Sequence, residues 1–253
     1  MNLFEELNSV KQPINFLPDG RHGESLETFK HIAGSWANVP FPFSLKDGYY
    51  RFGILGLLSH LNLLALPDTH IIEIGTGESS IYLTETARRL NRQIFYCDAA
   101  QGKMFNPLTI DGYLHEDTIF FKGSDIPEDY AKYKGVAFCG TSDEFFDKLK
   151  FPKIGFAFID GEHHYEYVKR DFDNIFNLLV PNGVICLHDT MPPDESYVLN
   201  DYCADAYKMR IDLEDDHRVD CFTFNKTVAV DVGLTMIRKR PLNLPYFQTA
   251  GNA

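Results

Sequence analysis

The sequence lacks long hydrophobic runs, paired cysteines and an export signal. Its longest apolar stretches, such as Ile54 to Leu58, fall far short of the roughly 20 residues needed to span a bilayer. The five cysteines show no CxxC spacing, as is typical of proteins kept in a reducing compartment. The first residues are acidic and polar, whereas an export signal begins with a basic region and continues with an apolar one. These absences predict a cytoplasmic protein.

Positive charge is also scarce. The chain has 24 lysines and arginines against 36 aspartates and glutamates, which gives a formal net charge of −12. No block of basic residues interrupts this excess of negative charge. Because nucleic acids and anionic membranes attract cationic surfaces, both are disfavoured as partners. We expect a small-molecule partner, and the sequence is compatible with a homo-oligomer.

At 253 residues the chain can bury one sizeable core, and its apolar runs alternate with helical patterns. Continuous apolar strands separated by helices predict a parallel sheet that is covered on both faces. The strand-like runs are residues 71–74, 94–97, 136–139, 154–159 and 184–187. Residues 118–121 could add a short strand, and the runs 218–224 and 233–238 predict a hairpin at the sheet edge.

The predicted fold class is therefore α/β, doubly wound, with a mostly parallel sheet and an antiparallel last strand. Residues 1–48 have no convincing periodicity and are interpreted as an irregular amino-terminal cap, followed by one domain over residues 49–240 and a tail over 241–253. A helix is expected over residues 49–66. Another should follow the fourth strand, because Val168, Phe172, Ile175 and Leu179 fall on one face. A turn at residues 181–183 would lead into the fifth strand.

The most informative motif is HIIEIGTGESSIYL, residues 70–83, in which an apolar run enters a glycine turn and then a helical pattern. Gly75 and Gly77 suit a backbone that needs positive φ or the close approach of a ligand. Such a strand, turn and helix is typical of a nucleotide-type site, so we predict that both glycines and Ser79 bind a cofactor. A plain strand-to-helix turn is the alternative.

The charges at this turn indicate which cofactor it would take. Glu73 precedes the glycines and Glu78 follows them, so a pyrophosphate would meet two carboxylates at the helix N-terminus. Ser80 also stands where the dinucleotide pattern has its third glycine. S-adenosylmethionine, with a sulfonium and an ammonium against one carboxylate, suits an acidic turn that includes Glu73.

Two further positions fit the nucleoside of such a cofactor. Asp98 ends the second strand, 21 residues after Gly77, where an acidic residue can bind ribose hydroxyls. Alternatively, Asp98 caps the next turn. After the third strand, the polar turn at residues 140–143 places Ser142 to meet the adenine, although such residues also make ordinary helix N-caps.

The strongest catalytic candidates follow the fourth and fifth strands. Asp160 ends one strand, while His188 and Asp189 end the next, so all three can converge at the carboxyl edge of the sheet. Two carboxylates and an imidazole suit a divalent cation, with magnesium or calcium favoured by oxygen ligands and manganese, iron or zinc by the imidazole. The alternative is that Asp160 orders its loop while His188 and Asp189 form a hydrogen-bonded pair without metal. Either His188 or His163 is a credible base for a substrate hydroxyl.

Residues 163–165 begin the helix that follows Asp160. Because adjacent helical positions point in different directions, at least one of His163 and His164 should be a surface or capping residue.

Taken together, these motifs resemble the class I S-adenosylmethionine-dependent methyltransferases. The sequences FIDGEHHYEYVKRDF (158–172) and LLVPNGVICLHDT (178–190) are similar to the group that includes macrocin O-methyltransferase and the cephalosporin-hydroxylase-like proteins. The resemblance implies a seven-stranded Rossmann-like sheet with a reversed last strand, and methyl transfer to a hydroxyl oxygen of a small molecule such as a sugar or glycan. It also implies a magnesium ion held by Asp160 and Asp189, with His188 where a carboxylate is usual.

Two other functions remain as alternatives. One is a non-catalytic module that keeps the nucleoside site for folding or assembly. The other is a nicotinamide-dependent oxidoreductase, against which Glu78 and Ser80 argue.

Overall fold

The computed structural model describes residues 53–99, 115, 117–123, 126–224 and 232–241. The predicted amino-terminal cap and nearly all of the predicted tail lie outside these residues. The division into cap, domain and tail therefore stays a prediction.

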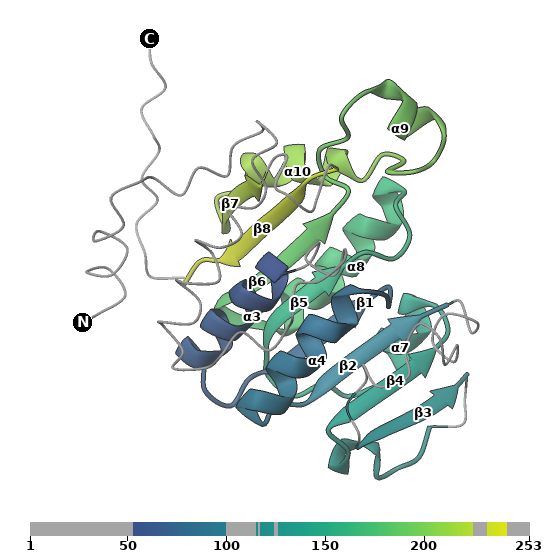
Figure 1. Cartoon of the computed structure of the whole chain (residues 1–253), viewed down its shortest axis with the longest axis vertical. Helices are drawn as coiled ribbons and strands as arrows, with labels where there is room; N and C mark the ends of the chain where they lie inside the picture. The colour runs from purple at the N-terminus through teal and green to yellow at the C-terminus, as the bar shows by residue number, and fades with distance from the viewer. Residues whose placement is uncertain (1–52, 100–114, 116, 124–125, 225–231, 242–253) are drawn as a thin grey trace.

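One eight-stranded sheet forms the centre of the described chain, in the order β3-β4-β2-β1-β5-β6-β8-β7 (Figure 1). Strand β8 pairs antiparallel with both β6 and β7, and the other pairings are parallel. The strands are β1 (His70–Ile74), β2 (Ile94–Asp98), β3 (Thr118–Lys122), β4 (Gly135–Cys139), β5 (Ile154–Ile159), β6 (Leu179–His188), β7 (Val219–Phe224) and β8 (Leu234–Lys239).

The predicted fold class is confirmed, including the reversed last strand and the pairing of the two carboxyl-terminal runs. The sheet has eight strands where the family resemblance implied seven, because residues 118–122 pair with β4 as an additional edge strand. Strand β6 also begins earlier than predicted. Leu179 already pairs with Ile154, and the expected turn at 181–183 is an irregularity within the strand, with Asn182 at φ 65°.

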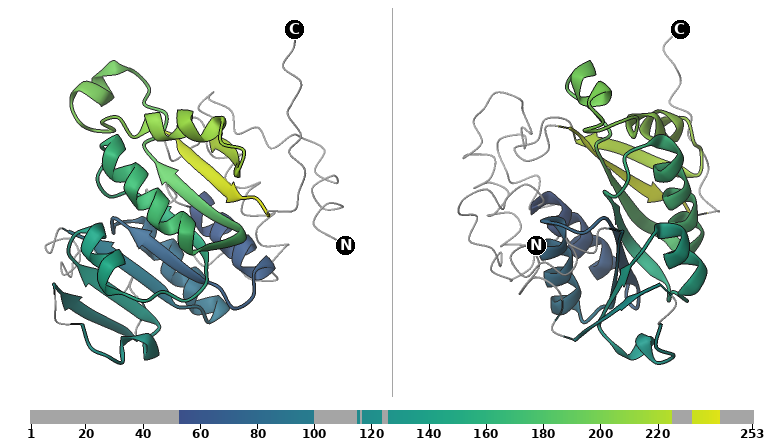
Figure 2. Two further views of the ribbon diagram at one scale, coloured as in Figure 1. Left: turned by 180° about the vertical axis from the view of Figure 1, so that it is seen from behind. Right: turned by 90° about the vertical axis from the view of Figure 1, so that its right-hand side faces the viewer.

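Two layers of helices cover the sheet, as the views in Figure 2 show. Helices α3 (Gly53–Ala65) and α4 (Ser79–Leu90) lie on one face, and α7 (Ser142–Lys148), α8 (Tyr165–Leu178) and α10 (Tyr207–Glu214) lie on the other. Short helices η1 (Tyr130–Lys132) and α9 (Glu195–Leu199) complete the described elements. Ile71 and Ile72 enter opposite cores, since successive strand residues point to opposite faces.

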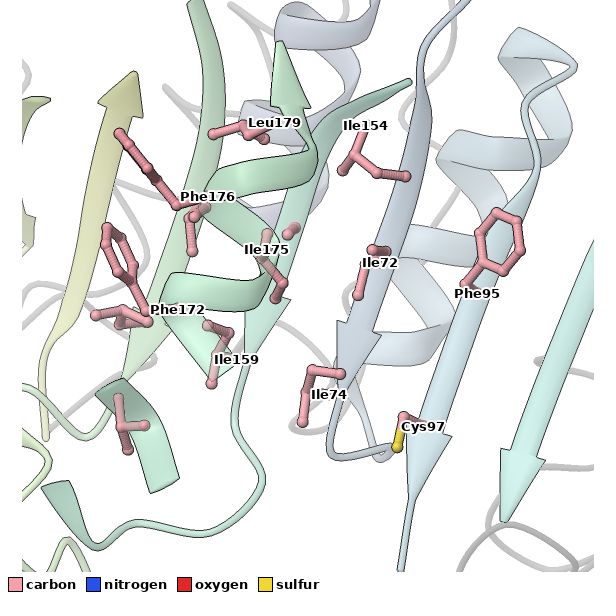
Figure 3. Close-up of a cluster of buried hydrophobic side chains, with 14 of the residues drawn as sticks. Ile72, Ile74, Phe95, Cys97, Ile154, Ile159, Phe172, Ile175, Phe176 and Leu179 are labelled. Atoms are coloured by element: carbon pink, nitrogen blue, oxygen red, sulfur yellow. The ribbon is translucent and has the colours of Figure 1, made fainter. Parts of the chain in front are cut away.

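Helix α8 packs onto β5 and β6 through an apolar stripe (Figure 3). Its buried residues are Val168, Asp171, Phe172, Ile175 and Phe176. The predicted helical face is confirmed for Val168, Phe172 and Ile175, whereas Leu179 belongs to β6. The one acidic side chain on this face, Asp171, was not predicted from the sequence.

The order of the strands locates the site. Strand β1 lies between β2 and β5, and Ile74 pairs with Cys97 on one side and Ile159 on the other. The chain reverses its direction of winding here, and ligands of open α/β sheets bind outside the carboxyl ends of the strands at such a point.

Among the described helices, none is long and apolar enough to cross a membrane.

Candidate active site

The glycine turn lies against the end of β5. Gly75 has φ +82°, and a Cβ atom there would lie 2.0 Å from the carbonyl oxygen of Asp160. The amide of Asp160 donates to the carbonyl oxygen of Ile74 at 2.8 Å, which keeps the two segments together. Gly77 is different, because a Cβ atom there would meet nothing within 4 Å. The fold thus requires glycine at position 75, while the glycine at position 77 leaves open space above the turn.

Glu73 lies fully buried beneath this turn. Its Oε1 accepts a hydrogen bond of 2.6 Å from the Ser79 hydroxyl, and no described group donates to Oε2. Burial raises the pKa of Glu73 to about 8, so the carboxyl is mostly protonated at neutral pH. A nearby cation would favour its ionised form, which is compatible with a sulfonium or ammonium ligand. Without a ligand, the glycine turn therefore carries less negative charge than its sequence predicted.

Asp98 ties the second strand to the glycine turn. Its Oδ2 accepts hydrogen bonds from the Thr76 amide at 2.9 Å and from the Thr76 hydroxyl at 2.7 Å. Asp98 therefore stabilises the glycine turn that precedes it, and it also lines the cavity described next. Its predicted contact with ribose stays a prediction.

A cavity of about 550 Å³ opens at the carboxyl ends of β1, β2, β4 and β5. This volume lies within the range of roughly 300–1,000 Å³ that is usual for small-molecule sites. Three residues predicted to bind the cofactor line it, namely Gly75, Asp98 and Ser142, together with Asp160. Glu73, Gly77 and Ser79 are not part of its described lining, so their predicted contacts with cofactor stay predictions.

Ser142 and Asp171 both line this cavity. Ser142 is the first residue of α7, and its hydroxyl hydrogen-bonds to the carboxyl of Asp171. Burial raises the pKa of Asp171 to about 6. The sequence reasoning missed this residue, although an acidic side chain between Val168 and Phe172 on an apolar helix face would have revealed it.

Beside the cavity, two carboxylates and two imidazoles converge. His188 Nδ1 lies 3.0 Å from Asp160 Oδ1 and 3.1 Å from Asp189 Oδ2. His163 Nε2 lies 3.1 Å from Asp189 Oδ2 and 3.5 Å from Asp160 Oδ1. The structure thus brings together all the predicted catalytic and metal-binding residues. His163 joins the group from the loop before α8, because this helix begins at Tyr165 and not at residue 163 as expected.

The charges in this cluster balance one another. Burial alone would raise the pKa of Asp160, but His188 and His163 hold it below its ordinary value. Burial would lower the pKa of His188, but Asp160 and Asp189 raise it to about 10. A hydrogen bond with Asp160 raises the pKa of His163 against the effect of burial. In the absence of other cations, His188 keeps its proton at neutral pH and is poorly suited to act as a base.

The geometry favours His163 as the imidazole that faces a ligand. Its Nδ1 lies 2.7 Å from the carbonyl oxygen of Tyr202, which can only accept, so Nδ1 carries a proton. This bond orients Nε2 toward Asp160 and Asp189, as carbonyl partners do for metal-binding histidines. The ligand atoms of Asp160, His163 and Asp189 lie within 4.8 Å of one another.

Asp189 is held in an unusual conformation. It has φ 57°, in the left-handed region, and its side chain is buried. The Cys203 thiol donates to its Oδ1 at 3.3 Å, which leaves Oδ2 toward the two imidazoles. Such local strain is typical of functional sites.

The neighbouring His164 does not join this cluster. It is the N-cap residue of α8, and its Nδ1 lies 2.5 Å from Glu162 Oε1 on the surface. The expectation that one of the paired histidines is a surface or capping residue is therefore confirmed.

With this geometry in place, comparisons with known proteins become informative. Residues 72–190 match a family model described as a methyltransferase domain. This segment contains the glycine turn and every member of the cluster. Residues 72–190 are thus similar to a methyltransferase domain.

Solved structures with this fold cover nearly the whole chain. An O-methyltransferase from Bacillus cereus, in complex with S-adenosylhomocysteine, has a TM-score of 0.54 and 17% identity, covering 93% of this chain and 96% of that one. The O-methyltransferase TomG from Streptomyces achromogenes, in complex with S-adenosylmethionine, has a TM-score of 0.54 and 13% identity, covering 94% and 95%. At these identities, the likeness of this chain to both proteins is one of fold.

A curated relative is also similar to this chain in sequence. It is the uncharacterized protein y4gI of Sinorhizobium fredii, which is 24% identical over 235 residues. The match covers 88% of this chain but only 25% of that protein. The chain thus spans about a quarter of the length of this relative.

Proposed function

We propose that the methyltransferase domain transfers the methyl group of S-adenosylmethionine to a hydroxyl oxygen of a small molecule. The observation that carries this proposal is the position of the cavity, which meets both the glycine turn and Asp160. A donor in the cavity would have its reactive end beside the cluster of acids and imidazoles. The two similar structures described above, both named O-methyltransferases, support the choice of oxygen as acceptor.

The reaction needs little covalent chemistry from the protein. A bond forms between the acceptor oxygen and the methyl carbon as the carbon–sulfur bond breaks, and S-adenosylhomocysteine leaves. Most of the catalysis would come from holding the oxygen in line with the methyl group. The hydroxyl proton must also be removed, and His163 can take it at Nε2 because its Nδ1 proton is committed to Tyr202.

Alternatively, the cluster fits a divalent cation, in which case Nε2 of His163 would bind the cation and would not act as the base. Asp160, His163 and Asp189 offer two carboxylate oxygens and one oriented imidazole nitrogen. His188, the imidazole ligand expected from the sequence, contacts both carboxylates through Nδ1 and would help to position them as ligands. A bound cation would lower the pKa of an acceptor hydroxyl. With an imidazole among the donors, manganese, iron or zinc is favoured over magnesium.

The acceptor would approach from the segment that follows β6. Tyr202 holds His163 through its carbonyl oxygen while its side chain is 61% exposed, and its ring meets that of Tyr197 edge to face at 5.4 Å. The exposed ring of Tyr202, a residue whose carbonyl oxygen contacts His163, suits a ring-shaped acceptor such as a sugar.

Calorimetric titration with S-adenosylhomocysteine tests the proposal, run with manganese, with magnesium and after chelation. Micromolar binding in all three conditions is expected, because the cavity does not need the metal to hold the donor. A screen of sugars and phenols with radiolabelled donor should then detect methyl transfer. Failure to bind S-adenosylhomocysteine would overturn the proposal, and binding without transfer to any hydroxyl would favour the non-catalytic module. Tight binding of NADH would instead revive the oxidoreductase alternative.

A further inference from the structure

Strands β6 and β8 remain joined beyond the end of their regular pairing. Their antiparallel register is regular up to His188, which lies opposite Leu234. A further hydrogen bond follows, in which the amide of Met191 donates to the carbonyl oxygen of Val232 at 2.7 Å. Met191 lies three residues after His188, whereas Val232 lies only two residues before Leu234. The β6 side therefore contains one residue more than the β8 side, which is the defining feature of a β-bulge.

This bulge contains Asp189. In a regular strand, successive side chains point to opposite faces of the sheet, so those of His188 and Asp189 would be directed apart. They meet instead, with 3.1 Å between His188 Nδ1 and Asp189 Oδ2. Asp189 has φ 57°, and one class of bulge contains a residue in this left-handed region. The extra residue and its backbone conformation thus turn the carboxylate of Asp189 toward the imidazole.

The opposite side of the bulge requires glycine. Gly233 immediately precedes β8 and has φ +86°, and a Cβ atom there would lie 2.5 Å from Cβ and 2.6 Å from the amide nitrogen of Met191. A side chain at position 233 would therefore displace either β8 or residues 189–191. Strand β8 is paired with β6 on one side and with β7 on the other, so we expect residues 189–191 to move.

Buried hydroxyl groups hold the residue that follows Asp189. Thr190 and Thr235 are both fully buried, and the Thr235 hydroxyl donates to the Thr190 hydroxyl at 2.7 Å. The hydroxyl of Thr223 lies 2.9 Å from that of Thr235. From α10, Arg210 Nε donates to the carbonyl oxygen of Thr190 at 3.0 Å. Hydroxyl groups are costly to bury unless they are hydrogen-bonded, and a buried network with its bonds satisfied favours a single arrangement of the chain.

We propose that this bulge positions the carboxylate of Asp189 for the reaction, with Gly233 and Thr235 as positioning residues that act through residues 189–191. The inference rests on the proposed function, since it takes Asp189 as part of the site of methyl transfer. It gives the reversed strand β8 a role in the site, because β8 orders the segment that follows β6. A bulge that only ended the pairing of two strands would not make the position of Asp189 depend on these residues.

Crystal structures and manganese binding of Gly233→Ala test the inference. The added methyl group should displace residues 189–191 and lengthen the distance from His188 Nδ1 to Asp189 Oδ2 beyond the hydrogen-bonding limit of about 3.5 Å. Manganese affinity, measured by paramagnetic resonance, should fall by about 10-fold or more, as it does when groups that orient metal ligands are removed. The affinity for S-adenosylhomocysteine should stay unchanged, because residues 189–191 and 233 are not part of the described lining of the cavity.

Thr235→Val provides a second variant in case Gly233→Ala does not fold. It removes the hydroxyl that donates to Thr190 but keeps the branched shape of the side chain, so manganese binding should weaken in the same direction. Thr235→Ser, which keeps the hydroxyl, should restore the natural affinity. The matched control is Thr223→Val, which removes the neighbouring hydroxyl and leaves the bond between Thr235 and Thr190 in place. Its manganese affinity should equal that of the natural chain.

A merely structural role would lower the stability of Gly233→Ala and Thr235→Val in urea but leave Asp189 in its natural position and manganese affinity unchanged. That result in the folded variants would overturn the inference, as would an equal loss of affinity in Thr223→Val. If the natural chain binds no manganese, the position of Asp189 in the crystal structures decides. Failure of the natural chain to bind S-adenosylhomocysteine would overturn the proposed function, whereas the crystal structures would still decide whether the bulge positions Asp189.

Discussion

The carbonyl oxygen of Asp160 occupies the space that a side chain at Gly75 would need, 2.0 Å from the position of its Cβ atom. The turn expected to hold the donor and the acid expected to serve the acceptor are therefore in backbone contact. Strand pairing enforces this contact, because Ile74 and Ile159 are partners in the parallel ladder. The glycine turn and Asp160 are therefore held together by the pairing of β1 with β5.

The two glycines of the turn should respond differently to alanine. Gly75→Ala forces a strained φ and a backbone clash, so its free energy of unfolding should fall by at least about 2 kcal/mol. Gly77→Ala meets only open space, so its stability should change by less than about 1 kcal/mol. Its affinity for S-adenosylhomocysteine should nevertheless fall, because the added methyl group enters the space left for the ligand. Urea denaturation and calorimetry measure the two effects, and an unchanged affinity in Gly77→Ala would contradict the assignment of this turn to the donor.

A substitution of Asp160 should reduce methyl transfer without weakening the binding of the donor. Asp160→Asn keeps the backbone contact with Gly75 but removes the charge that His163 and His188 share. We expect methyl transfer to fall by about 10²- to 10⁴-fold, the range for groups that act in proton transfer. The dissociation constant of S-adenosylhomocysteine should stay within about threefold. Equal loss of both would place Asp160 on the donor side.

The two histidines of the cluster should differ in their effect on metal binding. His163 points Nε2 at both carboxylates, so His163→Ala should weaken manganese binding by about 10-fold or more, as detected by paramagnetic resonance. His188→Ala should have a smaller effect, because the group whose ligand atoms could hold one cation consists of Asp160, His163 and Asp189. His164→Ala, at the exposed N-cap, is the matched control. If His188→Ala weakened manganese binding more than His163→Ala did, His188 would be the imidazole ligand, as expected from the sequence.

Glu73 should make stability depend on pH. Its pKa rises from an ordinary value of 4.5 to about 8 on folding, so between these values the folded protein retains a proton that the unfolded chain has lost. The folded state is therefore destabilised progressively as pH rises through this window, by up to ~1.4 kcal/mol per pH unit. The glutamine side chain in Glu73→Gln does not titrate, so this variant does not show the pH-dependent loss of stability. Its melting temperature relative to the natural chain should rise between pH 5 and pH 8, whereas parallel melting curves would show that Glu73 is ionised in the folded protein.

The sequence by itself determined the order of strands and helices, the reversed last strand and the position of the glycine turn. These features depend on local patterns, because alternation and helical spacing of apolar residues report which side of each element is buried. The residue at which each strand ends also depends on nearby sequence. Because the carboxyl ends of parallel strands lie at one edge of a sheet, the convergence of Asp160, His188 and Asp189 could be predicted. The additional edge strand and the early start of β6 depend on pairing with distant residues, and the sequence left them open or placed them wrongly.

Only the tertiary structure decided how the side chains of the site are arranged. His163 reaches the carboxylates because the carbonyl oxygen of Tyr202, 39 residues away in sequence, turns its ring. The pairing of Ser142 with Asp171 likewise requires α7 and α8 to meet beside the cavity. The physical reason is that hydrogen bonds between distant residues depend on the register of strands and the packing of helices. Hydrophobic periodicity determines which face of an element is buried, but it does not determine which polar atoms then meet.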